Sequence, residues 1–142
     1  MTLVEVLAAI LIFTFGLLSV AKLYASLMSA HISNEQITAV QTYGNRFWAV
    51  LQASPDALGC STTAQSLSFE TAAQVSGAPP GLQSLLNEIM AEKSPLGAPS
   101  VSIVLSALGS QEGECEATVN VAWTSQSGGA RSQTFTFQVG GL

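Results

Sequence analysis

Charged side chains are scarce in this chain of 142 residues, where they make up only 9%. An ordinary soluble protein has roughly 25%. Basic residues are the scarcest: four Lys and Arg stand against nine Asp and Glu, for a net charge of −5. Nucleic-acid binding needs clustered Lys and Arg to displace counterions from phosphates, so nucleic acid is not an expected partner. Arg46 and Arg131 leave open a small basic pocket, should the fold bring them together.

Residues that bind metals through nitrogen or sulfur are also few, namely His31 and two cysteines, Cys60 and Cys115. Neither cysteine belongs to a zinc motif or a CxxC pair, so we expect no metal site and no cofactor. In an oxidising compartment Cys60 and Cys115 are expected to form a disulfide, which the chain-entropy model values at roughly 4 kcal/mol. Two buried free thiols are the alternative.

No group of residues in the sequence has the pattern of a catalytic site. His31 has no partnered Ser or Cys, and the Ser/Lys spacing of Ser19 and Lys22 falls in an apolar run. The acidic residues within 112–116 are too few to supply a calcium loop. We therefore expect a protein that is not an enzyme.

The main positive feature is an apolar N-terminal stretch of about 19 residues, close to the roughly 20 that cross a bilayer core. No ionisable side chain lies between Glu5 and Lys22, and no proline precedes Pro55. These features predict one helix over 2–53, roughly 78 Å long at 1.5 Å per residue. Its second half carries apolar or small residues at steps of three and four, which form one face of a helix: Ile37, Val40, Gly44, Phe47 and Leu51. Gly44 in this face would let a sheet approach closely.

The remainder of the chain predicts a small head of α+β class. Apolar and turn-forming residues indicate a short amphipathic helix over 82–93 and strands over 101–108, 115–124 and 131–139, with a hairpin turn over 127–130. The expected fold is a long N-terminal helix packed on a small antiparallel sheet, with Trp48 and Trp123 in the core. We divide the chain into 1–25, the membrane or filament-core half of the helix, and 26–142, the head with the amphipathic half.

Glu5 is the residue that separates the functional interpretations, because a carboxylate in a membrane-depth helix is costly without a partner. One interpretation is local: Thr2 and Glu5 fit a capping box that satisfies N–H groups of the first turn. The other is intermolecular: a free amino group on Met1 would pair with Glu5 of a neighbouring copy and fix the stagger between subunits. The residues alone leave both open, and the two are compatible.

Residues 1–10, MTLVEVLAAI, closely resemble the mature N-terminus of type IV pilins and of type II secretion pseudopilins. The run Gly16-Leu17-Leu18 is most similar to PilV-type minor pilins, and the resemblance covers about the first 25 residues. It implies that a prepilin peptidase removes a leader ahead of Met1, that Met1 is N-methylated, and that Glu5 pairs with the terminal amine of another subunit. Lys22 stands where major pilins often have proline, which favours a minor pilin or a pseudopilin.

The resemblance implies a minor pilin that acts in pilus assembly, initiation or tip structure through its N-terminal helix. Its expected partners are other pilins, the prepilin peptidase, the inner-membrane assembly platform and the membrane itself. Its expected location is the bacterial inner membrane, crossed once with a periplasmic head, and the assembled pilus or fimbrium. Two alternatives stay open: a type II secretion pseudopilin, and a signal-anchored periplasmic binding or adhesive module in which the helix is only a tether.

Overall fold

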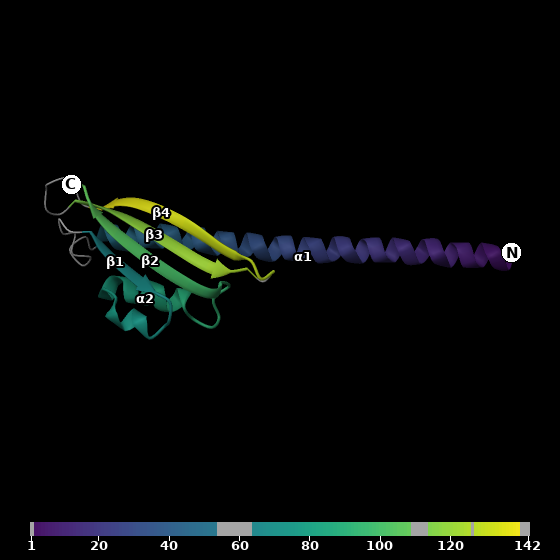
Figure 1. Cartoon of the computed structure of the whole chain (residues 1–142), viewed down its shortest axis with the longest axis horizontal. Coiled ribbons are helices and arrows are strands. Elements are labelled where there is room, and N and C mark those ends of the chain that lie inside the picture. Colours follow the sequence, from purple (N-terminus) through teal and green to yellow (C-terminus); the bar gives the residue numbers. More distant parts are fainter. Residues whose placement is uncertain (1, 54–63, 109–113, 126, 140–142) are drawn as a thin grey trace. The chain divides into compact units, whose positions relative to one another are not determined.

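The computed structural model describes residues 2–53, 64–108, 114–125 and 127–139. They form a long helix, a short 3-10 helix, a second α-helix and a four-stranded antiparallel sheet (Figure 1). The predicted α+β class, a long apolar helix with a small antiparallel sheet, is therefore confirmed. The chain separates into two compact units, Met1–Asn34 and Glu35–Leu142.

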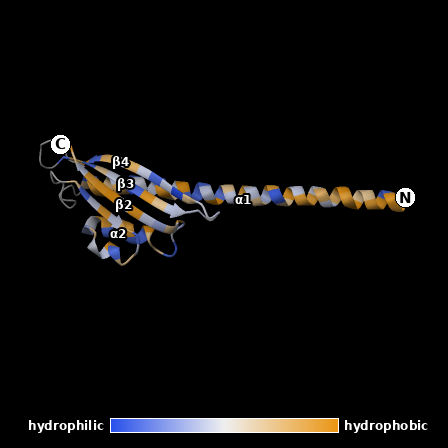
Figure 2. Cartoon of the chain, viewed as in Figure 1, coloured by the Kyte–Doolittle hydropathy of each residue, from blue (hydrophilic) through white to orange (hydrophobic). Residues whose placement is uncertain are grey.

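Helix α1 spans Leu3–Ala53, as the sequence predicts to within one residue. Its first turn is closed by the Thr2 carbonyl, which accepts hydrogen bonds from the N–H groups of Glu5 (3.0 Å) and Val6 (3.3 Å). The first unit consists of this helix alone, so its large apolar side chains are exposed from Leu3 to Met28. Figure 2 shows the apolar colouring running along the N-terminal part of α1.

The sheet of the second unit has the order β1-β2-β3-β4, with every neighbouring pair antiparallel. The strands are β1 (Gln65–Phe69), β2 (Gly97–Ala107), β3 (Cys115–Thr124) and β4 (Ala130–Val139). The bounds of β3 are those predicted, whereas β2 begins four residues earlier than expected. Strand β1 and the 3-10 helix η2 (Gln74–Gly77) were not predicted.

The core of this unit lies between one face of the sheet and two helices. Alternate residues of β2 and β3 are buried in this core. The apolar face in the second half of α1 (the stripe) and the apolar side of α2 (Pro80–Ile89) are buried there as well. Helix α2 begins two residues before the predicted 82–93, because Pro80 at its first turn suits a helix start, and it ends four residues earlier, at Ile89. The buried members of the predicted stripe are Val40, Gly44, Phe47 and Leu51; Ile37 is 37% exposed and belongs to the flank.

The two tryptophans have different environments. Trp123 is 5% exposed and lies in the core, as predicted, but Trp48 is 43% exposed, so its assignment to the core was wrong. The Trp48 ring contacts Phe137 of β4, with ring centroids 5.6 Å apart. Among the described strands β4 is an edge of the sheet, which fits the partial exposure of Trp48 beside it.

The opposite face of the sheet is polar and almost uncharged. By register, its rows across the strands combine small hydroxyl and amide residues, such as Ser68, Ser102, Asn120 and Thr134. Asn120 Nδ2 donates a hydrogen bond to Thr134 Oγ1 at 2.8 Å within one row. Glu116 is the only charged residue on this face among the paired positions of the four strands.

The β3–β4 hairpin turns at Ser125 to Gly129, two residues before the turn predicted over 127–130. Ser125 N–H donates to the Gly129 carbonyl and Gly128 N–H donates to the Ser125 carbonyl, both at 2.8 Å. Gly128 has a φ of 85°, in the left-handed region that side chains disfavour. A turn closed by these bonds and a left-handed glycine are common features of β-hairpins.

Candidate membrane and assembly segment

Glu5 is the candidate residue on which the functional interpretation depends. It lies exposed in the first turn of α1. At the helix start the Thr2 carbonyl accepts the backbone hydrogen bonds of the first turn, and the side-chain cap of Thr2 and Glu5 stays a prediction. The carboxylate of Glu5 has no ion pair or hydrogen-bond partner among the described residues. Met1 lies outside them, so its processing and its pairing with Glu5 remain predictions.

The segment around Glu5 has the length and composition of a membrane span. Helix α1 is the one described helix long and apolar enough to cross a bilayer, and none of its most apolar 18-residue window is buried within the chain. At 1.5 Å per residue such a window is about 27 Å long, near the roughly 30 Å of a hydrocarbon core. A signal sequence near an N-terminus shares this composition, so the helix fits membrane anchoring without deciding its purpose.

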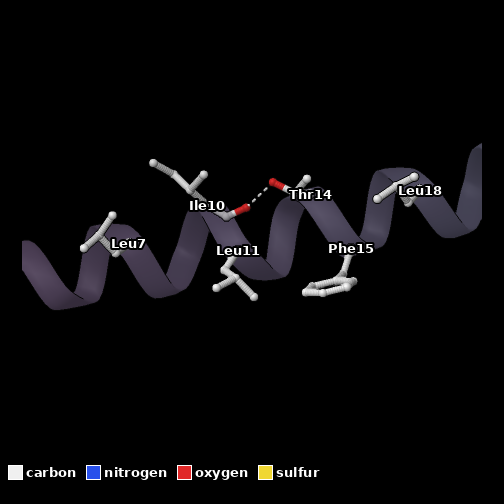
Figure 3. A pocket seen from close by; sticks show the side chains of 6 residues that line it. All are labelled: Leu7, Ile10, Leu11, Thr14, Phe15 and Leu18. Carbon is white, nitrogen blue, oxygen red and sulfur yellow. Dashed lines mark hydrogen bonds between the residues drawn. The ribbon is translucent and has the colours of Figure 1, made fainter.

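Two hydroxyl side chains interrupt the apolar surface, and both are satisfied within the helix. Thr14 Oγ1 donates to the Ile10 carbonyl at 2.6 Å (Figure 3), and Ser19 Oγ donates to the Phe15 carbonyl at 2.9 Å. Such bonds to the carbonyl four residues back remove the cost of an unpaired donor in lipid. The shallow groove beside Thr14 is consequently apolar, and it is lined by Leu7, Ile10, Leu11, Thr14, Phe15 and Leu18.

The disulfide prediction falls partly outside the described residues. Cys115, the first residue of β3, is 1% exposed and is disulfide-bonded. The chain has two cysteines, and the expected partner, Cys60, lies in the part that the structure does not describe.

The candidate catalytic, basic and metal-binding residues do not lie together in one site. His31 is exposed on α1. Arg46 Nη1 lies 2.7 Å from both carboxylate oxygens of Glu88, so this ion pair links α1 to α2. Arg131 lies exposed on β4. Within residues 2–53, 64–108, 114–125 and 127–139 no group of three or more His, Cys, Asp or Glu could hold a metal ion.

One polar residue that the sequence analysis missed is Gln36. It is 2% exposed, and its Nε2 donates a hydrogen bond to the Pro95 carbonyl at 3.0 Å. Gln36 precedes Val40 by one helical turn, so spacing alone would have placed it on the buried face. Its amide reaches a loop 59 residues away in sequence, a contact with no local signal.

The fold and the candidate segment define a class: an α+β protein with a membrane-compatible N-terminal helix and a small antiparallel sheet. Comparison with protein families, with curated proteins and with solved structures finds no match to this chain.

Proposed function

We propose that the chain is a minor pilin, a subunit that joins a type IV pilus through α1 and takes part in pilus assembly, initiation or tip structure. The observation that carries the proposal is Glu5, a carboxylate without an intramolecular partner among the described residues, at the start of a helix that is otherwise apolar up to Lys22. A carboxylate at membrane depth is costly unless a partner is supplied. The terminal amine of a neighbouring subunit is such a partner, and it fits the N-terminal resemblance.

The assembly mechanism is packing of apolar helices, with the Glu5–amine pair setting the register between subunits. The exposed apolar surface of α1 and its internally bonded hydroxyls suit both lipid and a helix-packed filament core. The prepilin peptidase would act before the subunit leaves the membrane, and the inner-membrane platform would act while the subunit moves from the membrane into the filament. The head has no catalytic task in this proposal; the protein would reside in the inner membrane and then in the pilus.

The decisive experiment compares Glu5→Ala and Glu5→Gln with Glu35→Ala in the bacterium that carries the gene. Glu35 is an exposed acid on the same helix but in the head unit, so it controls for loss of a charge from α1. Both Glu5 variants should reach the membrane at normal levels and be at least tenfold depleted from sheared filaments, whereas Glu35→Ala should incorporate normally. Normal incorporation of Glu5→Ala would leave a tethered binding or adhesive module as the better account.

Intact mass of the mature protein supplies an independent check on processing. A methylated Met1 preceded in the gene by a leader is the expected result. The fraction that contains the protein then separates a pilus subunit from a pseudopilin, because surface pili and secretion complexes can be purified apart.

A further inference from the structure

Strand β4 offers a long free edge to the surroundings. It pairs only with β3 among the described strands, through an unbroken register from Thr124↔Ala130 to Cys115↔Val139. Its residues are exposed except at positions 135, 137 and 139. The opposite edge strand, β1, has five residues against the ten of β4. A short edge offers little template for pairing, so the two edges of the sheet differ in kind.

The hairpin geometry determines which backbone groups of β4 face outward. Ser125 N–H bonds to the Gly129 carbonyl, and hydrogen-bonded and non-hydrogen-bonded pairs alternate along an antiparallel ladder. Odd-numbered residues of β4 therefore bond to β3. Even-numbered residues, including Ser132, Thr134 and Thr136, direct their N–H and carbonyl groups to the free edge.

This edge has few of the features that normally prevent strand pairing. Protected edges carry Lys, Pro, a bulge or inward charges. Strand β4 has one charged residue, Arg131, no proline, and no shift in its register with β3. Its sequence is rich in Thr and Phe, which favour extended backbone. It is therefore a ready template for another strand.

Three aromatic residues beside the edge add an apolar contact surface, which we call the aromatic shelf: Trp48, Phe135 and Phe137. The Phe135 and Phe137 rings are stacked, with centroids 6.2 Å apart and planes 4° apart, and Trp48 contacts Phe137. Both phenylalanines are partly buried and Trp48 is 43% exposed. The shelf lies on the α1 side of the sheet, where alternate side chains of an added strand would point.

We propose that the free edge of β4 binds an extended segment of a partner protein by strand addition, with the apolar side chains of that segment on the aromatic shelf. Another extended backbone can replace the solvent hydrogen bonds of an unpaired edge with a ladder of backbone hydrogen bonds, which is the known chemistry of strand addition. Apolar and polar residues should alternate in the segment, because the other face of the sheet is polar. An acidic residue should lie opposite Arg131.

A second copy of this chain fits the edge less well. Within the head, α1 runs in the same direction as β4, because Gly44 lies against Phe135 and Trp48 against Phe137. Antiparallel β4–β4 pairing would reverse one head against the other. Antiparallel pairing of two copies is therefore the alternative occupant that the self-association measurement distinguishes from a partner segment. Parallel β4–β4 pairing about a two-fold axis would put the aromatic shelf of one copy on the same side as the polar face of the other copy. Pairing of β4 with β1 of another copy would cover only half of the β4 edge.

The test uses the full chain in detergent micelles and a labelled ten-residue peptide of alternating Val and Thr with Glu at one end. Thr136→Pro removes an outward N–H without breaking the β3–β4 ladder, as proline is tolerated where an edge N–H faces solvent. Thr136→Val is the matched control, because it keeps the N–H. Thr134→Pro and Thr134→Val repeat the comparison at the neighbouring outward position, and thermal unfolding of each variant verifies its fold.

We expect fluorescence anisotropy to show saturable binding, weakened at least tenfold in the proline variants and little changed in the valine variants. A scrambled peptide of the same composition should bind at least tenfold more weakly. Equal binding by folded proline and valine variants, or no binding by the native chain, would overturn the proposal. Self-association of the chain that Thr136→Pro abolishes would overturn it in favour of a second copy. Glu5→Ala should bind the peptide normally, which separates this proposal from the pilin assignment.

Discussion

The ring of Phe135 occupies the space that a β-carbon on Gly44 would need: its Cζ lies 2.6 Å from the position of that carbon. Gly44 thus lets the edge strand approach α1, and the close approach that the sequence predicted is confirmed. The glycine is required here by contact rather than by backbone conformation, since it lies in the middle of a helix.

We predict that Gly44→Ala destabilises the head despite the better helix propensity of alanine. Propensity favours Ala by about 1 kcal/mol, but displacing the Phe135 ring should cost about 1–3 kcal/mol, as overpacked cores do. The expected net loss is therefore up to about 2 kcal/mol, measured by thermal unfolding of the full chain in detergent. Gly16→Ala is the control on the same helix, because no atom lies within 4 Å of its β-carbon position. Similar unfolding temperatures for both variants would contradict the prediction.

Gln36→Met should lower the free energy of unfolding by about 1–3 kcal/mol. The side chain keeps its approximate volume, but the Pro95 carbonyl loses its donor in a part-buried site, and an unsatisfied buried group costs that much. Denaturant unfolding of the full chain measures the loss. Gln41→Met, at an exposed position five residues later on α1, should change stability by less than about 0.5 kcal/mol. The prediction fails if the two variants unfold alike.

The Arg46–Glu88 ion pair should contribute little to stability despite its two short contacts. The side chains are 45% and 49% exposed, and solvent screens such pairs to about 0.2–1 kcal/mol. A double-mutant cycle with Arg46→Met and Glu88→Gln measures the coupling directly. The coupling energy should shrink further at about 1 M salt, where the screening length is about 3 Å. A salt-independent coupling above about 2 kcal/mol would show that screening is weaker here than the exposure indicates.

Elements with strong local patterns were predictable from the sequence. Strand β3 alternates Ala117, Val119, Val121 and Trp123 on one face, and its bounds were predicted to the residue. Helix α1 was predicted because nothing in its sequence breaks a helix before Pro55. Strand β1, by contrast, has only Leu67 and Phe69 as apolar residues, and it becomes a strand through its pairing with β2.

The error at Trp48 arose from a non-local contact. Trp48 was predicted to be buried because it is large and apolar, but its exposure depends on whether β4 has a further neighbour. The side-chain cap at Thr2 and Glu5 stays a prediction, because it depends on rotamers that the spacing does not determine. Glu5 itself was identifiable, because a lone carboxylate in an apolar helix is conspicuous in the sequence.

The polar outer face of the sheet affects how the head responds to salt concentration. Its rows of hydroxyl and amide groups are able to form hydrogen bonds with water, and Glu116 is the one charge among its paired positions. Screening by salt acts on charges and leaves such groups almost unaffected. This side of the head should therefore stay equally hydrated from dilute to concentrated salt, and any contact made through it should be insensitive to ionic strength.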